Sequence, residues 1–195
     1  MAHREQGIPR AAIAFYYAGM VHDLDSVLRR PEIRYLPRSN QIGWVPATNP
    51  YTNRIAPSRY EPMMRRYRLL EQMVREFRAR GVQMLVGTDA MNTGVVPGFS
   101  AHDELADLVA AGLTPYEALR AATANAAEFL GERTRGTIAV GQDADLLLLD
   151  ADPLKDIANT RRVAGVMLGQ RWLARGDLDD ILAELAATGR DRSRN

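Results

Sequence analysis

A helix that runs almost directly into a buried strand is the feature that most limits what this chain can fold into. Apolar residues recur at steps of three and four from Met63 to Phe77, which predicts one apolar stripe on a helix that ends near Gly81. The segment 82–87 (VQMLVG) follows with almost no linker and is apolar through most of its length, as in a parallel strand covered on both faces. A helix joined in this way to such a strand is half of a β/α repeat, so we expect an α/β fold.

Two further helices are predicted after this strand. The first covers 100–112 and begins with Ser100, three residues before Asp103. The second covers 114–131 and begins with a Thr-Pro-x-Glu pattern, which predicts a capping box with proline at the first helical position. Each helix ends at a glycine, so both boundaries are marked in the sequence.

The residues before the first helix are less regular. Residues 8–19 (IPRAAIAFYYAG) form a compact apolar run that fits a buried strand, although periodicity alone does not exclude a helix. Residues 30–57 are rich in proline, asparagine and threonine, which predicts a long irregular connection. Trp44 lies within this connection, so we expect part of it to pack on the rest of the protein.

The chemistry of the chain changes after residue 132. Residues 135–153 predict two short strands around a Gly-Gln-Asp turn, and 162–176 predict a hairpin around a Gly-Gln pair. Leu146 to Leu149 are an unbroken apolar run that needs cover on both faces, and the strands encoded here are too few to give it. An amphipathic helix from residue 177 and a disordered, arginine-rich tail are expected at the end of the chain.

Charge and cysteine content exclude several classes of function. The formal net charge is +1, so no overall field steers the protein to nucleic acid or to an anionic membrane. Arginines crowd 59–80, but glutamates lie among them, so a solvated helix face is favoured over a nucleic-acid surface. No apolar run approaches the ~18 residues that span a bilayer, and a cytoplasmic location is expected. The chain has no cysteine, so any metal must be held by His, Asp or Glu.

Asp89 directly follows the apolar segment 82–87, within Gly-Thr-Asp-Ala. The carboxyl ends of strands carry the catalytic groups of β/α barrels, because the strand aims the side chain while the next loop is free to vary. A carboxylate in this position can bind a divalent cation and accept a proton from water. From the four letters alone a structural role, in which Asp89 begins a turn or caps a helix, is favoured over metal binding, and both interpretations stay open at this point.

Residues 81–131 (GVQMLVGTDAMNTGVVPGFSAHDELADLVAAGLTPYEALRAATANAAEFLG) and 135–176 (RGTIAVGQDADLLLLDADPLKDIANTRRVAGVMLGQRWLARG) resemble the C-terminal part of the amidohydrolase superfamily, near its imidazolonepropionase-like and prolidase-like members. The resemblance implies an α/β fold made of a partial TIM (β/α)8 barrel, its last two β/α units, plus the C-terminal strands of a small β-sandwich. It implies three parts: barrel residues 1–132, sandwich strands 133–176, and a final helix and tail at 177–195. The cover of the leucine run is then expected upstream.

The resemblance also implies a site. Asp89 matches the aspartate at the end of the last barrel strand, which binds metal, acts as general base and later gives its proton to the leaving group. Thr88 is expected to orient Asp89, and His102 to contact substrate or to pack on the loop. The implied reaction is hydrolysis of a C–N bond in a small cyclic amide or dipeptide-like substrate. The implied cofactor is a divalent metal, with zinc the expected ion.

The sequence departs from the family in its metal ligands. The His-x-His of the first barrel strand, the bridging lysine and the later barrel histidines have no counterparts, and the histidines present are His3, His22 and His102. Of these, His3 is expected on the surface, and His22 lies just beyond the strand at 8–19. Lys155 lies in the sandwich-like region, so it cannot be the bridging lysine.

We therefore expect a fragment: the C-terminal portion of a larger enzyme, inactive alone, whose other ligands come from a missing N-terminal barrel segment or another chain. Its exposed strand edges predict self-association. The alternative is a non-catalytic remnant, a binding or oligomerisation module that keeps the fold but has lost the metal site. Nucleic acid and membrane are not expected partners.

Overall fold

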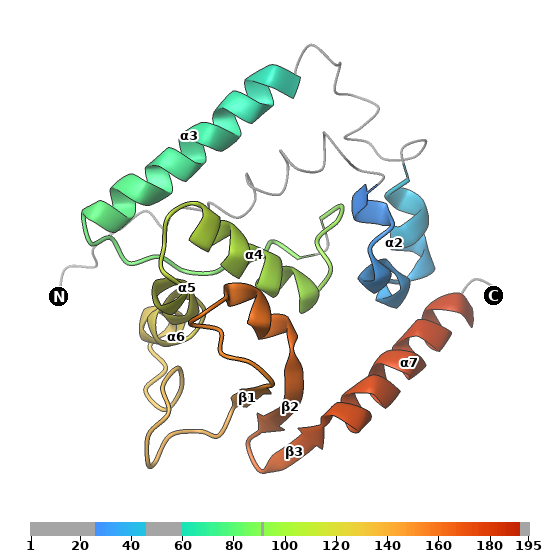
Figure 1. Ribbon diagram of the computed structural model, residues 1–195. Helices are drawn as coiled ribbons and strands as arrows, with labels where there is room; N and C mark the ends of the chain where they lie inside the picture. The colour runs from blue at the N-terminus through green and yellow to red at the C-terminus, as the bar shows by residue number, and fades with distance from the viewer. Residues whose placement is uncertain (1–25, 46–59, 91, 192–195) are drawn as a thin grey trace.

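The computed structural model describes residues 26–45, 60–90 and 92–191 of the chain (Figure 1). Its helices surround α4 on several sides, and a small sheet lies below α4 in that view. The elements in chain order are η1 (Pro31–Tyr35), α2 (Arg38–Gly43), α3 (Tyr60–Ala79), α4 (Phe99–Ala110), α5 (Pro115–Ala122), α6 (Ala124–Leu130), β1 (Leu146–Leu149), η4 (Ile157–Arg161), β2 (Val163–Leu168), β3 (Arg171–Ala174) and α7 (Arg175–Asp191).

The main core lies where α3, α4 and α5 meet the segment 82–88. The predicted stripe of α3 is confirmed from Tyr67 to Phe77, since its apolar side chains pack on this core and Val74 is fully buried. The buried members are Val74, Met84, Leu105, Leu108, Ala111, Leu113, Ala118, Ala121 and Ile157. Gly81 ends the helix with a φ of 66°, as its sequence position predicts.

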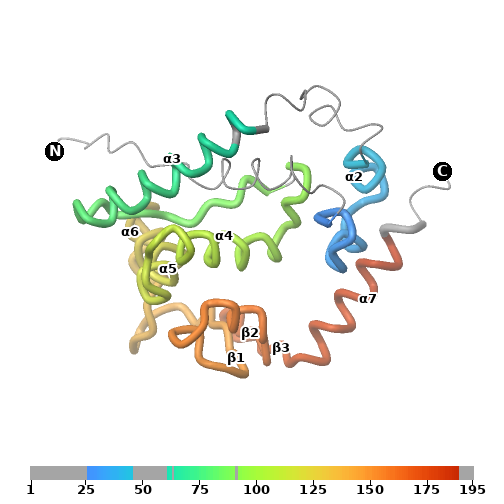
Figure 2. Tube along the Cα trace, turned by 45° about the horizontal axis from the view of Figure 1, so that its top comes forward, coloured from blue at the N-terminus to red at the C-terminus, as the bar shows by residue number. Residues whose placement is uncertain are grey.

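The prediction of a strand at 82–87 is wrong for the described residues. Figure 2 shows this segment as a stretched trace between α3 and α4, but no described strand lies beside it, so the hydrogen-bonded ladder that defines a strand does not form. The segment is held instead by the helices: Val86 N donates to Ala121 O at 3.2 Å, and Asn125 Nδ2 donates to Met84 O at 3.1 Å. The strand predicted at 8–19 lies outside the described residues.

Helix boundaries follow the sequence closely, with two corrections. The capping box of α5 is confirmed, since Thr114 Oγ1 accepts from Glu117 N and Glu117 Oε2 accepts from Thr114 N. Ser100 is not the cap of α4, because the helix begins at Phe99 and the Ser100 hydroxyl donates to Val96 O at 2.8 Å. The single helix predicted over 114–131 is two, because the backbone leaves the helical region at Thr123 (φ −129°, ψ −91°).

The region 31–43 is helical rather than irregular. Its two short helices form a second cluster in which Ile33, Leu36 and Trp44 pack against Val96 of the loop before α4. The expectation that Trp44 packs on the protein is confirmed, with 5% of its surface exposed. A proline-rich composition therefore marked short helices here, since η1 carries proline at its start.

The sheet is antiparallel, with strand order β1-β2-β3. The predicted hairpin is confirmed: β2 and β3 pair directly across the turn, with Leu168 opposite Arg171. The strand predicted before the Gly-Gln-Asp turn does not form, and Ile138 and Val140 are fully solvated there at 88% and 106% exposure. The leucine run forms β1 but lacks the cover it needs, since Leu147 and Leu148 are 49% and 54% exposed among the described residues.

The return from α6 to the sheet is fitted closely to the helices. Gly136 has a φ of 86°, and a Cβ built there would lie 2.7 Å from Ala127 Cβ and 2.9 Å from Thr123 O. Only glycine can occupy such a position without displacing its neighbours. The α5–α6 junction therefore fixes where the chain turns towards β1.

The last helix is longer than expected. α7 runs from Arg175 to Asp191, so residues 189–191 are helical rather than part of a disordered tail, and 192–195 lie outside the described residues. No helix in the described part is long and apolar enough to cross a membrane.

Candidate functional site

Asp89 stands where the segment 82–88 ends and the loop to α4 begins. Its backbone φ is 52°, in the left-handed region, and no other non-glycine residue in the described part of the chain has a positive φ. This conformation costs roughly 1–2 kcal/mol for an ordinary residue, and aspartate tolerates it better than most. A carboxylate held in this backbone state points to a local constraint, which is a common property of functional loops.

Asn92 supplies that constraint. Its side-chain Nδ2 donates to Asp89 Oδ2 at 2.5 Å and to Asp89 O at 3.1 Å, and its backbone N donates to the same carbonyl at 3.4 Å. The helix-cap interpretation of Asp89 therefore does not describe the structure, because the carboxylate accepts from a side-chain amide in a turn. The rest of the carboxylate is exposed and available to a ligand.

The loop behind Asp89 is well packed. Thr93, Val95 and Val96 are 6%, 1% and 4% exposed, while Thr88 is half-buried beside Asp89. A solvent-facing acid on a buried loop keeps its position without losing access to water. Sequence reasoning named Asp89 and Thr88 but missed Asn92, for which the signal was its three-residue spacing from an aspartate in a glycine-rich turn.

His102 contacts a different part of the fold. Its Nδ1 lies 3.0 Å from Thr160 Oγ1, on η4. Because the Thr160 hydroxyl donates to Ile157 O, Nδ1 must carry the proton and donate to Thr160, which leaves Nε2 as an acceptor. Burial and then the charge of Arg161 lower the pKa of His102, which favours the neutral ring. In the described residues His102 is therefore bound to Thr160 and not to Asp89.

Asp103 reinforces the same junction. Its carboxylate accepts from Arg30 Nη1 at 2.8 Å and from Arg161 Nη2, so one acid joins α4 to the residue before η1 and to the end of η4. The Asp103 side chain is 18% exposed, which limits solvent screening of both pairs. The start of α4 is thus a structural clamp, formed by His102 and Asp103 together.

Two further acids on α4 were missed by sequence reasoning. Glu104 is 2% exposed, its Oε2 has no hydrogen-bond partner among the described residues, and burial raises its pKa to about 8. Burial, followed by the charge of Asp103, raises the pKa of Asp107 to about 6. Glu104 lies four residues after Ser100 and four before Leu108, on the buried side of the helix, and that spacing was the available signal.

The described residues do not fit a zinc centre. Catalytic zinc takes three protein ligands and a water, and no group of three or more His, Asp or Glu side chains in the described part could hold a metal ion. Asp89 is the described side chain with the position and exposure of a ligand. His3 and His22 lie outside the described residues.

Comparison with known proteins agrees with the resemblance seen in the sequence. The model of the Amidohydrolase family matches residues 32–173. Imidazolonepropionase of Deinococcus deserti is 49% identical over 81 residues, which are 41% of this chain and 20% of that protein. Imidazolonepropionase of Deinococcus radiodurans is 39% identical over 99 residues, which are 50% of this chain and 24% of that protein. The chain thus spans about a fifth to a quarter of the length of these relatives.

Solved structures agree in fold. Bottromycin amidohydrolase has a TM-score of 0.73 and 26% identity, over 93% of this chain and 40% of that one. A putative prolidase from Bifidobacterium longum has a TM-score of 0.55 and 35% identity, over 67% of this chain and 34% of that one. The family model covers more than half of the 195 residues, and the structural neighbours share the α/β fold, so this chain belongs to the amidohydrolase family.

Proposed function

We propose that the protein hydrolyses the C–N bond of a small cyclic amide or a dipeptide-like amide. The observation that carries this proposal is Asp89, an exposed carboxylate in a left-handed conformation, fixed by Asn92 at the end of the segment 82–88. The names of the relatives support a small-molecule amide substrate, since the sequence relatives include imidazolonepropionases and the ochratoxinase of Aspergillus niger, and the structural neighbours include bottromycin amidohydrolase and a putative prolidase.

The proposed role of Asp89 is to transfer one proton from water to the leaving nitrogen, in two steps. Its carboxylate accepts a proton from a water molecule as the water oxygen forms a bond to the amide carbon. The tetrahedral product then breaks its C–N bond, and the proton held by Asp89 passes to the leaving nitrogen. The products are a carboxylic acid and an amine, joined in one molecule when the substrate is cyclic.

We propose a divalent metal only as an expectation from the family resemblance. Because the described side chains do not complete a zinc site, any divalent ion, zinc or another, would need ligands beyond Asp89 from residues outside the described part. Such ligands could lie in residues 1–25, in an N-terminal barrel segment or in another chain. Thr88 is proposed to orient Asp89, and His102 can reach substrate only through Nε2, since Nδ1 is bound to Thr160.

We also propose the domain assignment that the family resemblance implies. Residues 1–132 would be the last two β/α units of a TIM barrel, 133–176 the strands of a composite sandwich, and 177–195 a terminal helix and tail. Support comes from the sequential α3, segment 82–88 and α4, and from the separate sheet β1-β2-β3. The exposed leucines of β1 support self-association of the isolated chain through this sheet.

The test is a chimera in which residues 32–173 replace the matching region of an imidazolonepropionase relative. This design supplies a complete barrel whatever the source of the other ligands. Hydrolysis of cyclic amides and of dipeptide-like amides is measured for the chimera with and without Asp89→Asn. Activity on either class that disappears with Asp89→Asn supports the proposal. A folded chimera that binds such amides without hydrolysing them would instead support a non-catalytic binding module.

A further inference from the structure

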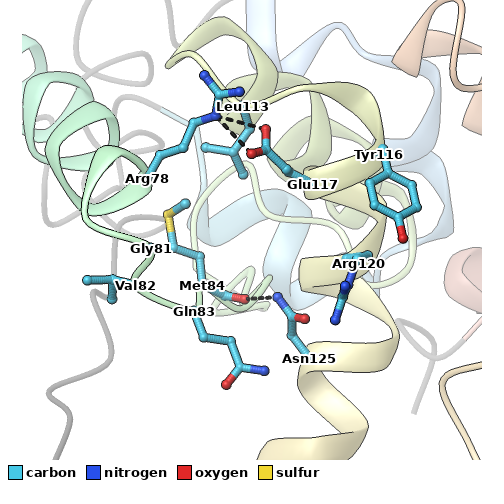
Figure 3. Close-up of a pocket in the computed structure, with 10 residues that line it drawn as sticks. All are labelled: Arg78, Gly81, Val82, Gln83, Met84, Leu113, Tyr116, Glu117, Arg120 and Asn125. Carbon is cyan, nitrogen blue, oxygen red and sulfur yellow. Dashed lines mark hydrogen bonds and ion pairs between the residues drawn. The ribbon is translucent and has the colours of Figure 1, made fainter.

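A cavity lies away from Asp89. It has a volume of about 300 Å³ and opens between the end of α3, the start of the segment 82–88, and helices α5 and α6 (Figure 3). None of the residues lining it is Thr88, Asp89 or His102. Small-molecule sites usually occupy roughly 300–1,000 Å³, so this cavity lies at the small end of that range and suits a small ligand.

One side of the cavity is apolar. Met84 and Leu113 contribute side chains that are otherwise buried in the main core, at 9% and 4% exposure. Tyr116 stands at the opposite side on α5 with 58% of its surface exposed, and Figure 3 shows its ring beside the cavity. A flat apolar group placed between these walls would cover an exposed aromatic ring and the edge of the core.

The positive charges that line the cavity are not fully balanced by negative ones. Arg78 Nε donates to both carboxylate oxygens of Glu117 at 2.9 Å, and Glu117 also caps α5 through Thr114. The hydrogen bonds from Arg78 and Thr114 lower the pKa of Glu117 to about 2, so the pair stays fully charged at neutral pH. This pair is complete without a ligand, and it leaves no carboxylate in the cavity to neutralise a second cation.

Arg120 is that second cation. It lies one turn after Tyr116 on the same face of α5 and is exposed, and its guanidinium has no hydrogen-bond or ion-pair partner in the described part of the chain. Asn125 lies beside it in Figure 3, and because its Nδ2 is already bound to Met84 O, its side-chain oxygen remains as an acceptor. The cavity thus offers one unmatched positive charge and one amide oxygen next to an apolar slot.

We propose that this cavity binds a small monocarboxylate with a flat apolar body. The carboxylate pairs with the Arg120 guanidinium, and the body lies between Tyr116 and the Met84–Leu113 wall. One negative charge balances Arg120, whereas a dianion would meet Glu117 as well. An inorganic anion would use the guanidinium alone and leave the apolar slot wet.

The test is a titration of the full 195-residue chain with benzoate, followed by the amide resonances of residues 78–84 and 113–125. Acetate is titrated in parallel as a carboxylate that lacks the flat apolar body. Inorganic phosphate is titrated as an anion of a different shape. Saturable benzoate binding is expected, about tenfold tighter than acetate or phosphate. Arg120→Gln should weaken benzoate binding about tenfold, because it removes the charge-assisted hydrogen bonds.

Arg171→Gln is the matched control, since Arg171 is an exposed arginine on β3 outside the cavity. It should bind benzoate as the unsubstituted chain does. Tyr116→Ala should weaken benzoate while leaving acetate unchanged, which tests the apolar wall separately from the charge. Absence of saturation, equal affinity in Arg120→Gln, or acetate binding as tight as benzoate would overturn the proposal.

Discussion

Glu104→Gln should stabilise the protein at neutral pH, against the usual result of changing a fully buried residue. Glu104 is 2% exposed and burial raises the pKa of its carboxyl from the ordinary 4.5 to about 8. At any pH between 4.5 and about 8, the Glu104 carboxyl is therefore protonated in the folded protein and ionised in the unfolded chain. Stability is therefore unaffected by it below pH 4.5 and falls as the pH rises towards 8.

The size of this effect follows from the pKa. Each pH unit between the two values costs about 1.4 kcal/mol, so at pH 7 the ionisable carboxyl lowers the free energy of unfolding by ~3 kcal/mol relative to a neutral side chain of the same shape. Asp107, whose pKa burial raises to about 6, contributes in the same direction. Glutamine keeps the shape of Glu104 and removes only the proton equilibrium at that residue.

Urea denaturation at pH 4 and at pH 7 measures this directly. Glu104→Gln should match the unsubstituted protein at pH 4 and exceed it by ~3 kcal/mol at pH 7. Glu132→Gln, at an exposed position, is the control and should change stability by less than ~0.5 kcal/mol at either pH. A loss of stability with Glu104→Gln at pH 7 would refute the reasoning, because it would mean that the carboxylate is ionised and held by donors.

Three further predictions follow from the packing and hydrogen bonds. Gly136→Ala should destabilise the protein by ~2–4 kcal/mol in urea denaturation. Gly141 has nearly the same φ but open space around it, so Gly141→Ala should cost only ~1–2 kcal/mol. Equal losses of stability would show that the close contact at Gly136 is unimportant. Asp103→Asn should cost ~1–3 kcal/mol by the same measurement, since it weakens both arginine contacts of α4, and a neutral effect would argue against the clamp. Asn92→Ala should cost less than ~1 kcal/mol because the bond is exposed, yet lower the hydrolysis rate of the chimera about tenfold by releasing Asp89; an unchanged rate would contradict the positioning role.

Local chemistry made parts of the fold predictable. The capping box at Thr114 and Glu117, the apolar stripe of α3 and the turn between β2 and β3 each depend on residues close in sequence, and all three are confirmed. The strand at 82–87 failed for the opposite reason. A strand exists only beside a partner, and its apolar pattern says nothing about whether that partner is in place.

The sequence named Asp89 as the candidate site residue, and its role stays a prediction, whereas the residues around it were not named. Asp89 could be found because it follows an apolar run and lies in a motif that resembles a known family. Asn92 and Glu104 were missed although their spacings were visible in the sequence, because their contacts depend on the left-handed turn at Asp89 and on the depth at which α4 is buried. His102 was noticed for its place after the loop, but its ring bonds to Thr160, a contact between residues 58 positions apart that no local pattern encodes.

The most direct test of the proposed function is the ratio of kcat values for amide hydrolysis by the chimera with and without Asp89→Asn. Removing the group that takes and returns the proton should lower kcat by ~10²–10⁴-fold. Asp150→Asn, which alters an exposed carboxylate on the sheet side, should leave kcat unchanged. A chimera that retains its full kcat with Asp89→Asn would contradict the central claim that this aspartate performs the proton transfers.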